Sequence, residues 1–165
     1  MSPLRNEVDV RVKQSLLDRL CDDEPEVSVD RPVSRYQSLR LLKASLVRDL
    51  SALLNTKRSE IPGSAEYAEL SQSLLLFGLP DFTAYGLKNP AEQNRLRREV
   101  ESSIRRFEPR LSSVTVHLDA RGEFDPSLHF RVDAQLKIEP EPEPVTFDTV
   151  LEADTCHFFV AGDKR

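Results

Sequence analysis

The spacing of hydrophobic residues changes along this chain at one segment, Phe107-Glu108-Pro109-Arg110. Before it, hydrophobic residues recur every three or four positions, as on one face of an α-helix. After it, they alternate with polar residues, as in a β-strand with one buried face. Because Pro109 disfavours helical geometry at Glu108, a helix is expected to end there and an extended segment to begin. Helices followed by strands indicate an α+β fold, with the helices packed on one face of a small antiparallel or mixed sheet.

The helical spacing is strongest in residues 36–54, where leucines form one continuous apolar stripe. Asn89-Pro90 is a typical helix start, an N-cap residue followed by Pro at the first helical position. It predicts a helix over 90–107, which is expected to bury Leu96, Val100, Ile104 and Phe107.

Shorter helices are expected over residues 10–20 and 65–77. The first places Leu16, Leu17 and Leu20 on one face. The second is expected to end at Gly78 and to bury Tyr67, Leu70, Leu74 and Phe77.

After the junction, residues 113–118 and 128–138 predict an antiparallel hairpin with its turn in 121–126. With the turn centred on Gly122-Glu123, Leu118 lies opposite Leu128, and the apolar residues of both strands share one face.

The segment 139–144 alternates Glu and Pro and is expected to be a stiff, solvated spacer. Short strands over 145–152 and 157–160 follow it. Such Pro-linked terminal strands are candidates for pairing with the sheet edge of another chain.

The length of 165 residues fits one domain, and 39% hydrophobic residues suffice for one core. Residues 22–34 are acidic, contain Pro and lack periodicity, which indicates a surface linker. We therefore predict an N-terminal helix and acidic linker over 1–34 and an α+β domain over 35–165. No apolar run is long enough to span a membrane or to act as a signal peptide, and Cys21 and Cys156 are too few and too distant for a disulfide-built scaffold. A cytoplasmic protein without membrane insertion is expected.

Charge is distributed unevenly. The net charge is −5, while residues 95–110 carry six Arg and three Glu and residues 119–165 carry a net −6. The glutamates interleaved with the arginines, and the absence of outward aromatic residues on the hairpin, argue against a nucleic-acid partner. A solvated helix face, or one that docks on an acidic protein, fits this pattern better.

Glu108 and Arg110 are the most informative polar pair. Residues two apart in an extended segment point to the same side, and both share parity with Val114, which places them at the rim of the buried face. Glu108 follows the negative end of a helix, where a carboxylate is disfavoured unless a cation such as Arg105 or Arg106 lies close. Two interpretations stay open: an ion pair that only ends the helix, and a binding site for another protein.

Enzymatic and metal-binding roles fit the residues poorly. The arginines favour the ionised form of Glu108, the reverse of what a general acid needs, and the sequence cannot place Asp81 as a second carboxylate. In the expected register His117 lies opposite His129, and Cys156-His157 could add two further ligands, but the paired ligand spacing of a structural zinc site is absent. We expect no catalytic residue, metal, cofactor or small-molecule substrate.

Several segments occur in an order that resembles a known family. They are Ser15-Leu16-Leu17-Asp18-Arg19-Leu20, Leu53-Leu54-Asn55-Thr56, Ser73-Leu74-Leu75-Leu76-Phe77-Gly78-Leu79-Pro80-Asp81, Phe107-Glu108-Pro109-Arg110-Leu111 and Phe147-Asp148-Thr149-Val150-Leu151. In this order they resemble the TssE family, the baseplate wedge components of type VI secretion systems, which is similar to the phage tail-baseplate wedge proteins once termed lysozyme-like. One departure is Cys156, because a Gly is expected after Asp154-Thr155 in a tight turn; the turn type stays open.

The resemblance implies a non-enzymatic protein whose fold is similar to the inner domain of the contractile sheath subunit. It implies that Glu108, Pro109 and Arg110, with Arg105 and Arg106 beside them, contact the other wedge subunits. It also implies that the strand carrying Val145, Phe147, Thr149 and Leu151 contacts the sheath and starts its polymerisation. The assembly would be cytoplasmic and docked at the membrane.

Two rival functions follow from the same sequence. One is a regulatory anti-adaptor, resembling small stress proteins of this fold that bind a single response regulator. The other, an enzyme, is a peptidoglycan hydrolase. A pull-down and a cell-wall clearing assay separate them from a wedge component.

Overall fold

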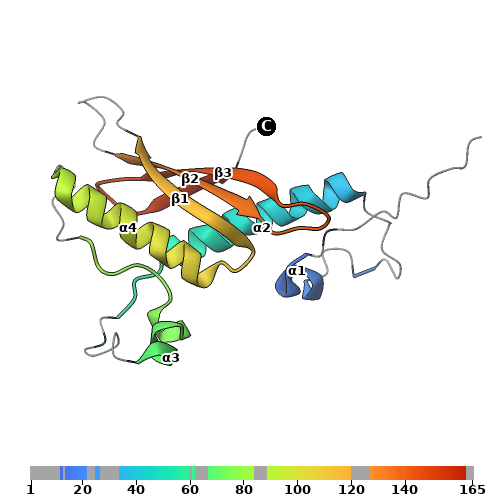
Figure 1. The fold of residues 1–165 in the computed structure, drawn as a ribbon, viewed down its shortest axis with the longest axis horizontal. Coiled ribbons are helices and arrows are strands. Elements are labelled where there is room, and N and C mark those ends of the chain that lie inside the picture. Colours follow the sequence, from blue (N-terminus) through green and yellow to red (C-terminus); the bar gives the residue numbers. More distant parts are fainter. Residues whose placement is uncertain are drawn as a thin grey trace, which may run out of the picture.

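The computed structural model describes residues 12, 14–21, 25–26, 34–59, 61, 67–83, 89–119 and 127–162. Most of the acidic segment 22–34 and the hairpin turn 121–126 therefore lie outside the described residues. The elements, shown in Figure 1, are α1 (Leu16–Leu20), α2 (Arg35–Asn55), α3 (Ala68–Ser71), the 3-10 helix η2 (Leu74–Leu76), α4 (Pro90–Phe107), β1 (Leu111–Asp119), β2 (Leu128–Leu136), β3 (Glu143–Leu151) and β4 (Phe158–Gly162).

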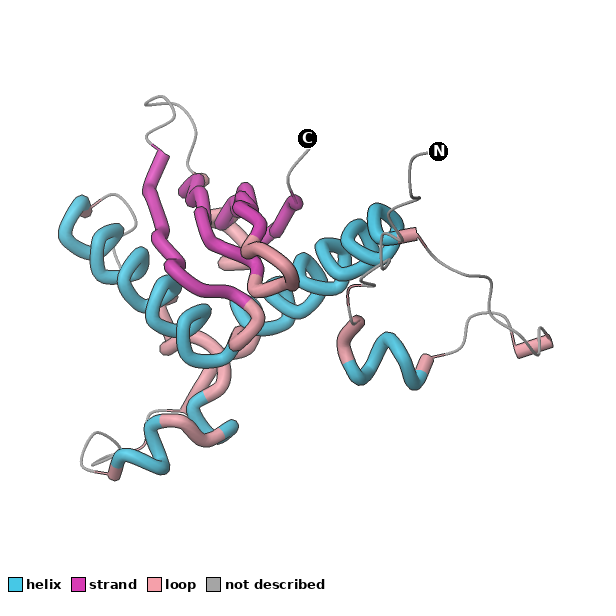
Figure 2. Tube along the Cα trace, turned by 45° about the vertical axis from the view of Figure 1, so that its right-hand side comes forward, coloured by secondary structure: helices cyan, strands magenta, loops and turns pink. Residues whose placement is uncertain are grey.

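The four strands form one antiparallel sheet in the order β1-β2-β3-β4. Helices α2 and α4 lie on the same side of this sheet (Figure 2), with α4 against β1 and α2 against β4. The expected α+β fold, with helices on one face of a small sheet, is confirmed.

Side-chain caps start both long helices, and the cap of the second is the one that the sequence predicts. The Ser34 side chain accepts from the Gln37 amide and Gln37 binds back to Ser34, a capping box that starts α2. The Asn89 side chain accepts from the Ala91 amide at 2.9 Å, ahead of Pro90. The helix predicted over 90–107 is confirmed with those bounds.

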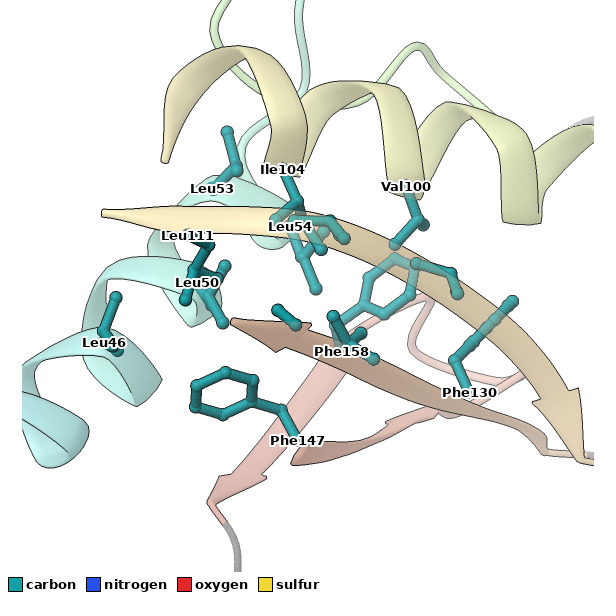
Figure 3. Close-up of a cluster of buried hydrophobic side chains, with 14 of the residues drawn as sticks. Leu46, Leu50, Leu53, Leu54, Val100, Ile104, Leu111, Phe130, Phe147 and Phe158 are labelled. Atoms are coloured by element: carbon teal, nitrogen blue, oxygen red, sulfur yellow. The ribbon is translucent and has the colours of Figure 1, made fainter. Parts of the chain in front are cut away.

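The core lies between these helices and the sheet (Figure 3). Leu46 and Leu50 from α2 and Ile104 from α4 meet phenylalanines of the sheet, namely Phe130, Phe147 and Phe158. Each such side chain contributes about 1.5–3 kcal/mol by leaving water. The apolar stripes read from the sequence are thus the buried faces of both helices, while Phe107 is only partly buried.

The hairpin register differs from the prediction. Leu118 lies opposite Phe130 rather than Leu128, a shift of two residues that leaves the same face buried. A β-bulge between Ser112 and Thr115 adds a residue to β1, and Ser113 there has φ of 51°. The bulge breaks the assumed parity of Glu108 and Arg110 with Val114, because both Leu111 and Val114 are buried.

Two of the expected helices are shorter than predicted. In the first, the described helix is limited to Leu16–Leu20, and its three leucines are exposed. In the second, α3 lacks a side-chain cap and is followed by η2, and Tyr67 and Leu74 are 64% and 81% exposed.

A contact with the end of α2 explains why the second of these helices stops short. Gly78, with φ of 105°, touches the backbone of Thr56, and the Leu79 amide donates to Thr56 O at 2.9 Å. A side chain at Gly78 would collide with that backbone. This pairing draws the segment away from helical geometry.

The expected Glu-Pro spacer is instead a bend between neighbouring strands. Glu143 and Pro144 already belong to β3 and lie opposite Leu136 and Gln135 of β2. The bend is favoured because it lets the apolar face of β3 complete the core. At the last turn, Cys156 adopts φ of 52°, the left-handed geometry for which a Gly was expected. None of the described helices is long and apolar enough to cross a membrane.

Candidate protein-binding site

The junction between α4 and β1 brings Glu108 and Arg110 together. Glu108 caps α4 with its amide bonded to Ile104 O, and Pro109 turns the chain into β1. Arg110 binds Glu108 in a bidentate pair, with Nε–Oε1 at 2.7 Å and Nη2–Oε2 at 2.5 Å. Glu108 is 5% exposed, whereas the Arg110 side chain is 25% exposed. Arg110 is therefore the member of the pair that solvent and partners can reach.

Arg110 also reaches across to α2. Its Nη2 donates to Asp49 Oδ2 at 2.7 Å, and its Nη1 lies 3.4 Å from Ser45 Oγ. The bonds to Glu108, and then to Asp49, raise the pKa of the Arg110 guanidinium above its ordinary value. The Glu108–Arg110 pair therefore links the junction to α2 within the chain.

The ion pairs continue from Asp49 to the N-terminal helix. Arg48 binds Asp49 at 3.1 Å and Asp18 of α1 at 2.7 Å. A hydrogen bond from the Ser15 hydroxyl, and then the one from Arg48, lower the pKa of the Asp18 carboxyl. One alternating chain of charges therefore connects α1 to the junction.

An open pocket of about 480 Å³ lies beside this chain of charges; we term it the junction pocket. Its charged lining includes Arg110. Its apolar lining comes from α1, α2, the end of η2 and the junction, and consists of Leu16, Leu17, Leu50, Ala52, Leu53, Phe77, Phe107 and Pro109. Phe77 and Phe107 meet edge to face at 5.4 Å, and Arg106 lies 5.9 Å from the Phe107 ring. This combination suits a partner that presents an apolar side chain with a carboxylate on a neighbouring residue.

The other predicted contact residues differ in availability. Pro109 and Arg106 are exposed. The Arg105 guanidinium binds Val114 O and Glu101, so it is committed to β1 and its own helix. Asp49 and Ser45 were not predicted to belong to this site, although their spacing of four on α2 indicates a shared polar spot beside the leucine stripe.

The predicted sheath-contacting residues lie in the core. Val145, Phe147, Thr149 and Leu151 are all buried, and β3 is paired on both sides by β2 and β4. Their side chains therefore contact this chain's own core. Among the described residues the outer strands of the sheet are β1 and β4.

The candidate catalytic and metal-binding groups are placed differently from what those roles need. Both oxygens of Glu108 accept from Arg110, which leaves neither oxygen to deliver a proton. Asp81 is exposed and accepts from the Thr83 backbone amide, the main cause that lowers its pKa, and from the Thr83 hydroxyl. His117 lies opposite Arg131 rather than His129, and no cluster of three metal-ligating side chains occurs in the described part of the chain.

Comparisons with known proteins give a family and a structural likeness. A family model described as baseplate wedge protein gp25 matches residues 40–141, a range that contains the junction, α4, β1 and β2. No curated protein matches the sequence. A chain from a solved structure named "The baseplate complex from the type VI secretion system" is similar, with 21% identity over 65% of this chain and 91% of that chain, at a TM-score of 0.43.

Proposed function

The chain belongs to the family of baseplate wedge protein gp25, and from this premise we propose that it is a TssE-type structural component of a type VI secretion baseplate. In that role it binds the other wedge subunits, connects the baseplate to the contractile sheath and helps to nucleate sheath polymerisation. The observation that carries the proposal is the family match, which covers more than half of the chain and includes the junction. The order of segments in the sequence supports the assignment to type VI secretion. The assembly is cytoplasmic and docked at the membrane.

Wedge subunits bind at the junction pocket. The pocket offers apolar area around Phe77 and Phe107 together with the exposed Pro109, and the exposed Arg106 lies beside it, over the Phe107 ring. Glu108 is buried and acts on this surface indirectly, because it fixes the position of Arg110. A partner helix that carries an apolar residue and a carboxylate matches this lining.

The sheath contacts the C-terminal edge of the sheet. Phe158, the first residue of β4, has its outward amide and carbonyl bound by the Asn55 side chain at 2.8 and 2.9 Å. Backbone groups alternate in direction along a strand, so the outward groups of β4 after Phe158 belong to Val160 and Gly162. In the described residues these groups have no partner, and they can accept a strand from another chain.

A structural role agrees with the chemistry of the junction. The carboxylate required for a peptidoglycan hydrolase would be Glu108, and it is held by Arg110 on both oxygens. No specific feature of the structure favours the anti-adaptor over the wedge component.

Co-purification with the tagged full-length protein tests the proposal. We expect several wedge subunits to co-purify with the wild-type chain and to be lost with the double variant Arg106→Glu, Pro109→Ser, whose sites are exposed. The matched control is Arg40→Glu, an exposed arginine on α2 away from the pocket lining. Capture of one soluble regulator would instead indicate the anti-adaptor, and clearing of cell walls by the purified protein would indicate the hydrolase; either result overturns the proposal.

A further inference from the structure

Strand β1 lies at one edge of the sheet, with β2 as its neighbour. The outward N–H and C=O groups of such a strand are a template on which another strand can pair. Unless this edge is covered, it is therefore open to pairing with a second copy of the chain.

Three side chains of α4 cover the middle of this β1 edge. Arg97, Glu101 and Arg105 are spaced four apart and so lie on one face of the helix. Arg105 donates to Val114 O from Nε at 3.0 Å and from Nη2 at 2.6 Å. Arg97 Nη1 donates to Val116 O at 3.1 Å, and Glu101 Oε2 accepts from the Val116 amide at 3.1 Å.

The same three side chains bind one another. Glu101 lies between the two arginines, with Oε2 at 3.2 Å from Arg97 and Oε1 at 2.9 Å from Arg105. Glu101 thus pairs with both arginines, and each of the three charged side chains also binds a backbone group of β1, which makes these hydrogen bonds charge-assisted. We call this group the edge network.

The β-bulge and the edge network are matched in position. At the bulge and beyond it, the outward backbone groups of β1 belong to Val114, Val116 and Leu118. The network binds the Val114 carbonyl and both groups of Val116 in the middle of the strand, whereas no side chain of the described residues hydrogen-bonds the Leu118 backbone. The opposite edge is treated differently: on β4 the Asn55 side chain covers Phe158, and the next outward residues of the described chain have no such cover.

We infer that the edge network closes β1 against antiparallel pairing with β1 of a second copy of this chain. Strand addition is then possible at β4 and is prevented at β1. The consequence for β4 rests on the proposed sheath contact, whereas the closure of β1 does not.

The test removes the network and follows association. In the triple variant Arg97→Ala, Glu101→Ala, Arg105→Ala, α4 keeps strong helix formers while β1 loses its cover. We expect this variant to dimerise with rising concentration in sedimentation experiments, while the wild-type chain, tested alone, stays monomeric. The matched control, Arg98→Ala, Glu99→Ala, Arg106→Ala, removes the same charges from α4, yet Glu99 binds Arg58 and none of the three hydrogen-bonds β1 in the described structure; it should stay monomeric.

Amide hydrogen exchange then locates the contact. At low concentration the Val116 amide of the triple variant should exchange roughly tenfold faster than in the wild type, since its acceptor is gone, while the Thr115 and His117 amides, which face β2, stay protected. At high concentration its protection should return. Glu101→Gln, which keeps an acceptor for Val116, should restore part of the protection.

Two outcomes overturn the inference. One is a triple variant that is folded, as a cooperative unfolding transition shows, and that remains monomeric at every concentration. The other is association in which the Val116 amide stays unprotected. If the triple variant does not fold, Glu101→Leu against Glu99→Leu provides the same comparison with less disturbance. Loss of wedge binding alone in any of these variants would bear on the proposed function and not on the edge network.

Discussion

Arg110 holds Glu108 of the junction and Asp49 of α2 at the same time. Because Glu108 is buried, its carboxylate depends on Arg110 to replace the water it has lost. We expect Arg110→Ala to lower the free energy of unfolding by about 3 kcal/mol, below the full cost of breaking a sealed ion pair because Arg110 is partly exposed. Urea denaturation measures this change.

A second variant separates the ion pair from simple loss of packing. Glu108→Leu, Arg110→Leu removes both charges and should cost less than Arg110→Ala alone, since no buried carboxylate is left behind. A double variant at least as unstable as Arg110→Ala alone would contradict this account. Alanine substitutions at Glu108 and Arg110 therefore lower the stability of the fold as well as affecting any interface, which is why the binding test uses Arg106 and Pro109.

Single residues also show how far the sequence predicts the site. The proximity of Glu108 and Arg110 followed from Pro109 and the extended geometry after it. The burial of Glu108 and the bond from Arg110 to Asp49 of α2 did not, because they depend on how α2 packs against the junction, which has no local signature. Cys156 was predictable as an anomaly: a turn that favours Gly is made with Cys at φ of 52°.

Among the elements, α1 is the one held mostly by charge. It has five residues, too few for a stable isolated helix, and its three leucines point largely to solvent. Asp18 joins it to Arg48, and the pKa of Asp18 is lowered in the folded chain, first by Ser15 and then by Arg48. The contribution of Asp18 to stability is therefore present above its unfolded value of 3.8 and is lost as pH falls through the lowered value.

We expect α1 to leave the junction pocket as pH falls below about 3.8, before the core between α2, α4 and the sheet unfolds. Chemical shifts of α1 residues followed by NMR during an acid titration measure this release. Asp18→Asn should release α1 at neutral pH. Asp81→Asn is the control, because Asp81 also has a lowered pKa but binds Thr83 and Lys57. Release of α1 only together with global unfolding would contradict the prediction.

The elements differ in how well their sequences specify them. Helices α2 and α4 were predictable because caps and apolar spacing agree along their whole length. The segment 65–77 has apolar spacing without a cap, and the pairing of Leu79 with the end of α2 prevails over that spacing. The register of the hairpin was missed by two residues because alternation fixes only parity, and a shift of two residues keeps the same face buried. The division at residues 34 and 35 coincides with the N-cap of α2 and stays a prediction.

At the scale of the whole molecule, the sheet has two edges of different character. The β1 edge is bound by charged side chains of α4, and the β4 edge is covered by Asn55 at Phe158 alone among the described residues. Strands β3 and β4 cannot both leave this chain to pair with another one, because Phe147 and Leu151 of β3 and Phe158 of β4 fill its core. Removal of residues 145–165 would therefore unfold the domain, and the sheath contact has to be tested at the backbone of β4.

Val160→Pro makes that test. The Val160 amide faces the free edge, so proline removes no hydrogen bond to β3, and edge strands tolerate proline at such positions. The variant should keep its fold and its wedge subunits, because the junction pocket lies on residues remote in sequence from β4, and should fail to nucleate sheath assembly, because an incoming strand loses the donor it needs and meets the proline ring. Val160→Ala keeps the amide and should nucleate normally, which separates backbone pairing from side-chain contact. Sheath formation on assembled baseplates, followed by electron microscopy, measures the outcome, and normal sheaths on Val160→Pro would refute strand addition at β4.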